Sequence, residues 1–156
     1  MGCDIHPHIE VKINGFWQHH SCPHFKRDYR LFAKLANVRN DGSIKPIALP
    51  RGLPKDISEV TTIEAKFWGR DGHSHSWINA EEIREAYLFH VKPSDDVLDG
   101  MTAEQQREYH WELLRTGMEW GYLCGMGFEA FCKHDVHSSC FPPQYEDLRM
   151  VFWFDN

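Results

Sequence analysis

The chain has 156 residues, of which 42% are hydrophobic and 26% are charged, a profile typical of a single folded domain over residues 1–156 rather than of a disordered or fibrous chain. The 23 acidic residues exceed the 17 basic ones and give a formal net charge of −6, which argues against general nucleic-acid binding. No apolar run reaches the roughly 18 residues of a membrane span, and the start lacks the charged and apolar regions of a signal peptide, so we expect a cytoplasmic protein with no membrane partner.

The first predicted element is a strand over residues 3–13, where polar and apolar residues alternate. This period of two indicates a strand with one buried face. Asn14-Gly15 follows, a pair typical of a two-residue hairpin turn, and a partner strand comes next. Because Pro7 has no backbone N–H, we expect the first strand to lie at a sheet edge or to be bulged there. Residues 19–25 are predicted to form a loop.

Four helices are predicted from residues that can cap their N-termini. These caps are Asp28, Ser58, Asn79 and Thr102, the last within a Thr-x-x-Gln capping box. The second helix has its apolar positions at Val60, Ile63 and Phe67, and Gly69 suits its C-terminal end. A proline-rich loop, residues 45–56, precedes this helix.

The last predicted element is residues 148–154, a compact apolar run typical of a strand buried on both faces. Repeated glycines between residues 117 and 127 interrupt any period, so no element is predicted there. The sequence therefore predicts an α+β fold. Its small, mostly antiparallel sheet includes both terminal strands and is packed with about four helices.

The polar side of the first strand is the main candidate site. Four potential metal ligands alternate along it: Asp4, His6, His8 and Glu10. Alternation points them to one side, roughly 6.5 to 7 Å apart at successive positions. Imidazole and carboxylate together suit a divalent metal, zinc first, with Mn, Fe or Ni as alternatives. If the terminal strands are neighbours, Asp155 would reach the same row. The alternative is the solvated face of an edge strand.

A second pair of imidazoles lies in residues 70–77, which we expect to be a polar turn. His73 would complete the metal site, and either Glu10 or His75 would serve as general base or acid. Arg51, in its Gly/Pro loop, is a candidate clamp for an anionic substrate. The alternatives are an ordinary turn before a helix for the two histidines and a surface ion pair for Arg51.

Cysteines offer further potential ligands. The five cysteines contain no C-x-x-C pair, which argues against a zinc ribbon and a disulfide framework. One group has four zinc-competent residues, although its spacing does not match a zinc finger: Cys132, His134, His137 and Cys140. Another group, which we rank below the others, comprises His19, His20, Cys22 and His24.

Several motifs spread over nearly the whole chain resemble a family of phage and prophage proteins of unknown function. They are MGCDIH at residues 1–6, RDYRLF at 27–32, LANVR at 35–39, RGLP at 51–54, HSHSW at 73–77 and VFWFDN at 151–156. The resemblance supplies no activity. It implies a phage-encoded protein that acts in the cytosol of a bacterial host.

Two motifs are also similar to the first and last motifs of calcineurin-like metallophosphoesterases. These are Asp-x-His at residues 4–6 and Gly-His-x-His at residues 72–75. In that family the corresponding residues hold a dinuclear metal centre. The similarity is partial, because the intervening Gly-Asp-x-x-Asp-Arg and Gly-Asn-His-Asp/Glu motifs are missing. It implies phosphoester or related hydrolysis by the same kinds of ligand.

Three functional hypotheses follow. The first is a metal-dependent hydrolase that acts on a small phosphorylated or otherwise anionic substrate, with its metal held by Asp4, His6, His8 and His73. The second is a non-catalytic phage protein that sequesters a nucleotide-like ligand or inhibits a host protein. It would use the polar face and tryptophans such as Trp17, Trp68, Trp77 and Trp153. The third is a structural or assembly protein in which the histidines only make hydrogen bonds.

Overall fold

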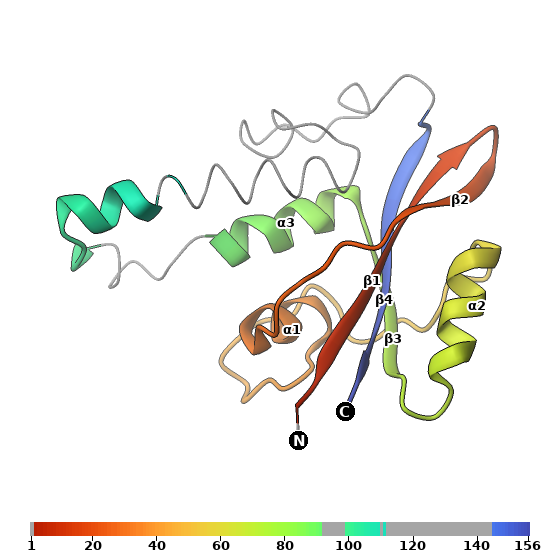
Figure 1. The fold of residues 1–156 in the computed structure, drawn as a ribbon, viewed down its shortest axis with the longest axis horizontal. Coiled ribbons are helices and arrows are strands. Elements are labelled where there is room, and N and C mark those ends of the chain that lie inside the picture. Colours follow the sequence, from red (N-terminus) through yellow and green to blue (C-terminus); the bar gives the residue numbers. More distant parts are fainter. Residues whose placement is uncertain (1, 92–98, 110, 112–144) are drawn as a thin grey trace.

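A computed structural model describes residues 2–91, 99–109, 111 and 145–156, and its centre is a four-stranded antiparallel sheet (Figure 1). The strands are β1 (Asp4–Ile13), β2 (Phe16–Ser21), β3 (His73–Asn79) and β4 (Asp147–Asp155). Their order across the sheet is β2-β1-β4-β3. The first and last strands of the chain are therefore the two central ones, which confirms the predicted α+β fold with a sheet that uses both terminal strands.

The predicted hairpin joins β1 to β2. Asn14 and Gly15 both have positive φ, 50° and 82°, the backbone conformation for which Asn-Gly turns are favoured. β2 pairs with β1 only from Ile9 onward, so Pro7 lies in the half of β1 that has no neighbour on that side. The prediction of a loop over residues 19–25 is wrong for its first part. β2 continues through Ser21 because its backbone pairs with β1.

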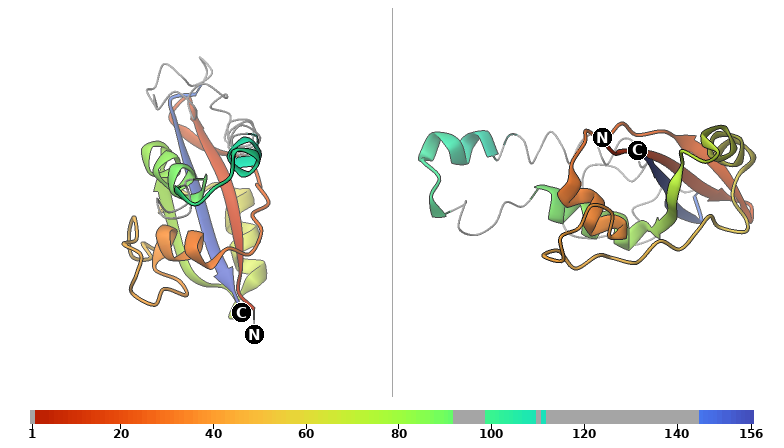
Figure 2. Two further views of the ribbon diagram at one scale, coloured as in Figure 1. Left: turned by 90° about the vertical axis from the view of Figure 1, so that its left-hand side faces the viewer. Right: turned by 90° about the horizontal axis from the view of Figure 1, so that it is seen from below.

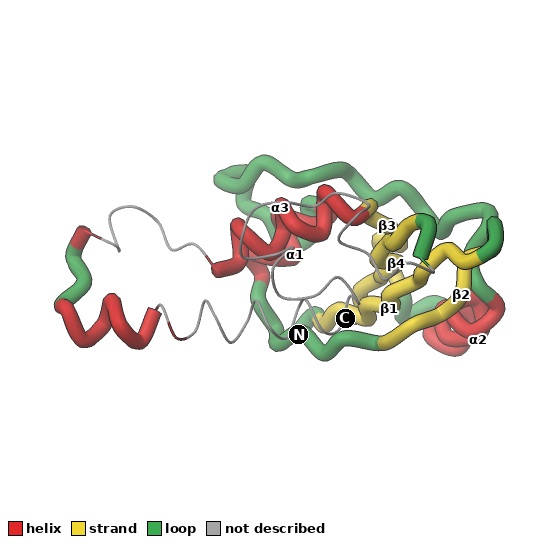
Figure 3. Tube along the Cα trace, turned by 90° about the horizontal axis from the view of Figure 1, so that it is seen from above, coloured by secondary structure: helices red, strands yellow, loops and turns green. Residues whose placement is uncertain are grey.

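One face of the sheet is apolar and packs against two helices, α1 (Tyr29–Ala36) and α3 (Ala80–Val91). Figures 2 and 3 show both helices on this side and α2 on the other. Phe32 of α1 meets Phe154 of β4 with ring centroids 5.1 Å apart. Leucine, isoleucine and phenylalanine side chains of these elements are fully buried, and they form the hydrophobic core.

The opposite face carries the polar row of β1 and is covered by α2 (Glu59–Trp68). The row does share one face, because the register places His6 opposite Trp153 and Glu10 opposite Arg149. It is not a solvated face, since His8 is only 5% exposed and Glu10 is 0% exposed. The polar groups of this row must therefore find partners inside the protein.

The three apolar positions that predicted the helix α2 face away from the sheet. Thr61 and Ala65 are its buried residues, whereas Val60, Ile63 and Phe67 are exposed, Phe67 by 81%. The helix was expected from its cap and its apolar spacing, and it forms. Its apolar side faces outward because the sheet surface beneath it is polar.

The predicted N-terminal caps are present. Asp28 and Ser58 each accept a hydrogen bond from a backbone N–H in the first turn of α1 and α2. Asn79 caps α3 in a reciprocal exchange with Glu82, 2.9 Å in each direction. Residues 103–109 are helical after the expected Thr-x-x-Gln capping box.

The expected polar turn over residues 70–77 is wrong, because residues 73–79 form β3. Two features hid this strand. Its register against β4 shifts between His73 and Ser76, and Ser74 has a φ of 52°, which marks a bulge. The proline-rich loop also runs along the strand, where the Gly52 N–H donates to the His75 carbonyl at 2.8 Å.

Candidate metal centre

Three potential metal ligands meet beside the β1–β2 hairpin. They are His8 on β1, His19 on β2 and Cys22 in the loop that follows. His8 Nδ1 lies 3.1 Å from His19 Nε2, and Cys22 Sγ lies 3.3 Å from each of these nitrogens. Across residues 2–91, 99–109, 111 and 145–156, no other group of three His, Cys, Asp or Glu residues has its ligand atoms within 4.8 Å of one another.

The hairpin register explains why these side chains meet. Glu10 pairs with His19, so His19 points to the same face as Glu10 and as His8, two residues earlier on β1. The register then shifts, and Ile9 pairs with Ser21, which leaves His20 as the extra residue of a bulge. Cys22 follows directly at the end of the strand. All three ligands therefore come from one short hairpin.

The triangle of ligand atoms has the dimensions of a zinc site. With Zn–N bonds of about 2.0 to 2.1 Å and Zn–S bonds of about 2.3 Å, tetrahedral ligand atoms are separated by about 3.3 to 3.6 Å. The separations of 3.1 and 3.3 Å lie within a few tenths of an ångström of these values. Small adjustments of the side chains would therefore suffice to seat a zinc ion.

Hydrogen bonding alone does not account for the three short contacts. A protonated ring nitrogen donates but cannot accept, and a thiol has a single proton. At most two of the three contacts can therefore be hydrogen bonds in any protonation state. A cation shared by all three atoms satisfies every contact at once.

The protonation states favour metal binding by the imidazoles. Burial lowers the pKa of His8 to about 4 and also lowers the pKa of His19, so both rings are neutral near neutral pH. Burial and the negative charge of Glu64 raise the pKa of the Cys22 thiol. A metal ion must therefore displace the thiol proton in order to bind.

The site is open on one side. His8 is buried and Cys22 is exposed, so the triangle faces solvent at the sulfur. Three protein ligands leave one tetrahedral position for water or another molecule, which is the arrangement of catalytic zinc sites, whereas structural sites use four protein ligands.

Of the predicted metal ligands Asp4, His6, His8 and His73, only His8 belongs to this centre. Asp4 is held by two hydrogen bonds from Arg27, at 2.9 and 2.7 Å. His6 Nε2 lies 3.2 Å from an Asp155 carboxylate oxygen, so Asp155 does reach the row. The imidazole of His6 stacks on Trp68 with ring centroids 3.9 Å apart.

The predicted convergence of His73 with the first strand does not occur. His73 pairs with Phe154 and stacks on its ring at 6.2 Å, on the apolar face of the sheet. His75 lies on the polar face and stacks on Trp153 at 5.8 Å. Residues two apart in a regular strand share a face, and the bulge at Ser74 breaks that rule.

The predicted catalytic groups Glu10 and Arg51 are both engaged in ion pairs. Glu10 accepts hydrogen bonds from the Ser58 backbone N–H and from Arg149 Nε, each at 2.8 Å. Burial alone would raise the pKa of Glu10, but the hydrogen bonds from Ser58 and Arg149 lower it overall. Arg51 makes a two-pronged pair with Glu82, at 2.6 and 2.8 Å. The proton-transfer and clamp roles would require these partners to be displaced.

Sequence reasoning ranked His19 and Cys22 below the polar row of β1, although one signal indicated that they would lie near His8. The Asn14-Gly15 turn fixes the hairpin register, and counting outward from it places His19 opposite Glu10, diagonal to His8. The candidate group of residues 132–140, the glycine-containing stretch 117–127 and any extension of the fourth helix past residue 111 lie outside the described residues.

Comparisons with known proteins place the chain in no family. No family model matches it, and neither a curated protein nor a solved structure is similar to it. Among the described helices, none combines the length and the apolar character that crossing a membrane requires. The chemistry of the site therefore carries the functional argument.

Proposed function

We propose that this protein binds a zinc ion through His8, His19 and Cys22. The observation that carries the proposal is the near-equilateral triangle of ligand atoms, with sides of 3.1 and 3.3 Å. Two imidazoles and one thiolate favour zinc over magnesium, calcium or manganese, which prefer oxygen ligands.

The open position extends the proposal to a metal-dependent hydrolase that acts on a small phosphorylated or otherwise anionic substrate. When bound, a zinc ion with a free position supplies Lewis-acid chemistry and lowers the pKa of water. Glu64 on α2 is exposed, and its charge acts on both His19 and Cys22. It replaces Glu10 as the proposed proton acceptor. The resemblance to phage proteins would place this activity in the cytosol of a bacterial host.

Metal content tests the binding proposal. Protein prepared without a nickel column is titrated with zinc, and with cobalt(II) as a spectroscopic probe. We expect one ion per chain, and a cobalt spectrum with the thiolate charge-transfer band of a tetrahedral site. His19→Ala and Cys22→Ser should lose both. His20→Ala is the matched control, because His20 neighbours the site on β2 but is exposed and lies outside the triangle.

Two results would count against the proposal. Substoichiometric zinc in the wild-type chain, or binding that persists in Cys22→Ser and His19→Ala, would refute the metal centre. If zinc binds but para-nitrophenyl phosphate and related esters are not hydrolysed, the hydrolase part fails and the metal centre stands. Glu64→Gln should lower turnover and leave the zinc stoichiometry unchanged.

A further inference from the structure

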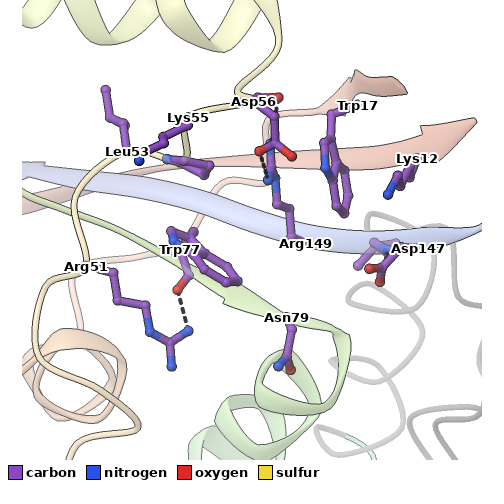
Figure 4. Close-up of a pocket in the computed structure, with 12 residues that line it drawn as sticks. Lys12, Trp17, Arg51, Leu53, Lys55, Asp56, Trp77, Asn79, Asp147 and Arg149 are labelled. Atoms are coloured by element: carbon purple, nitrogen blue, oxygen red, sulfur yellow. Dashed lines mark hydrogen bonds and ion pairs between the residues drawn. The ribbon is translucent and has the colours of Figure 1, made fainter. Parts of the chain in front are cut away.

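A cavity of about 520 Å³ opens on the polar face of the sheet (Figure 4). Its volume lies within the range of small-molecule sites. All four strands and the proline-rich loop contribute to its lining. The strand register sets the side chains in adjacent rows, with Lys12 opposite Trp17 and Asp147, and Arg149 opposite Asn79.

Two tryptophans stand on either side of the cavity. Trp17 comes from β2 and Trp77 from β3, the two edge strands, and Arg149 lies between them (Figure 4). The guanidinium of Arg149 is centred 4.0 Å from the Trp17 ring, and that of Arg51 is 4.9 Å from the Trp77 ring. These contacts hold both indoles in place as flat surfaces.

The two arginines are themselves fixed by carboxylates. Arg149 is held by Glu10 and by Asp56, whose Oδ1 accepts a hydrogen bond at 2.7 Å. Arg51 is held by Glu82 and also donates to the Trp77 carbonyl at 2.9 Å. The frame of the cavity therefore exists before any ligand arrives, which reduces the entropy cost of binding.

Two lysines add charge that has no acidic partner. Lys12 and Lys55 line the cavity, and neither side chain makes an ion pair within the described part of the chain. The Lys12 ammonium lies 5.9 Å from the Trp17 ring. Asp147 is the lining carboxylate that no arginine holds. The lining therefore contains two lysines without an ion pair and one carboxylate outside the arginine pairs, a balance that favours a ligand that carries negative charge.

We propose that this cavity binds a planar aromatic molecule with an anionic group, the chemistry of a nucleoside phosphate. The ring stacks on the indole of Trp77, as bases do on aromatic side chains. The positive charges of Lys12 and Lys55 attract the anionic group. The site is separate from the metal centre, since Glu10, buried in its pair with Arg149, lies between His8 and Lys12 along β1. Ligand binding is therefore independent of zinc.

Calorimetric titration with nucleoside monophosphates and their parent nucleosides tests this proposal. We expect at least one monophosphate to bind, and its nucleoside to bind more weakly. The Lys12→Gln/Lys55→Gln variant should weaken monophosphate binding by roughly tenfold and leave nucleoside binding unchanged. Trp77→Ala should weaken both, and Trp77→Phe should restore part of the affinity. Phe67→Ala, at an exposed position on α2, is the control that should change neither.

Several outcomes would overturn the proposal. The first is that no monophosphate binds, and the second is that nucleoside and monophosphate bind equally. The third is that the Trp77→Ala variant binds as the wild type does while circular dichroism shows that it is folded. His19→Ala separates this proposal from the metal centre. It should lose zinc and keep monophosphate binding, and loss of the monophosphate in a folded His19→Ala variant would refute the independence of the two sites.

Discussion

The buried ion pair between Glu10 and Arg149 gives a specific prediction, because Arg149 has a second charged partner and Glu10 does not. The Glu10 side chain is 0% exposed and that of Arg149 is 6% exposed, while Asp56, the second partner of Arg149, is 66% exposed. Removing one partner of a buried pair typically costs about 3 to 5 kcal/mol. Glu10→Gln leaves Arg149 with Asp56, so we expect a loss of about 3 kcal/mol.

Arg149→Met should cost more than Glu10→Gln. It leaves the Glu10 carboxylate buried with no positive partner, so we expect a loss of about 5 kcal/mol. The double variant should lose less than the sum of the two single losses, because no uncompensated charge remains. Asp56→Asn is the control. Because the Asp56 side chain is 66% exposed and Arg149 keeps Glu10 as its partner, this change should cost no more than about 1 kcal/mol.

Urea denaturation followed by circular dichroism measures these differences. With an m-value of about 2 kcal/mol/M, a loss of 3 kcal/mol lowers the midpoint by about 1.5 M. A Glu10→Gln protein that unfolds at the wild-type urea concentration would refute the reasoning.

Three further predictions concern pH, metal and surface. The unfolded chain protonates His8 near its ordinary pKa of 6.5, whereas the folded chain does so only at about 4. The free energy of unfolding of the metal-free protein should therefore fall by about 3 kcal/mol as the pH drops from 6.5 to about 4. A His8→Gln protein whose stability depends on pH equally steeply would contradict this prediction. At a free concentration one hundred times its Kd, zinc should add about 2.7 kcal/mol to the free energy of unfolding and so raise the melting temperature. EDTA should reverse this rise. A Cys22→Ser protein should show no such shift. Phe67→Ser should change the stability by no more than about 0.5 kcal/mol, whereas Phe32→Ala in the core should cost about 3 to 5 kcal/mol, as thermal unfolding will show.

Local signals in the sequence predicted local structure well. The alternation of β1, the Asn14-Gly15 turn and the capping residue Asp28 each act within a few neighbours, and each has its expected result. The strand β3 was missed because its alternation is broken at Ser74 and its composition is that of a turn.

The candidate metal centre depended on information of longer range. His8 and His19 approach only through the hairpin register, and the outward side of α2 depends on the polarity of a sheet surface built from distant segments. A run of potential ligands in one strand was therefore a poor guide to which side chains lie close enough to bind one ion. His73 illustrates this, since a single bulge places it on the wrong face.

The position of β4 has a consequence for how the protein assembles. β1 and β3 each pair with β4 and not with each other, so this strand alone joins the two halves of the sheet. Until residues 147–155 have been synthesised, the β1–β2 hairpin cannot be joined to β3 in one sheet, and the apolar side chains of the core remain exposed to water. Pairing must then close a span of 151 residues between Asp4 and Asp155, a slow kind of step. We expect a chain cut before β4 to be cleared by proteases rather than to persist as a smaller domain.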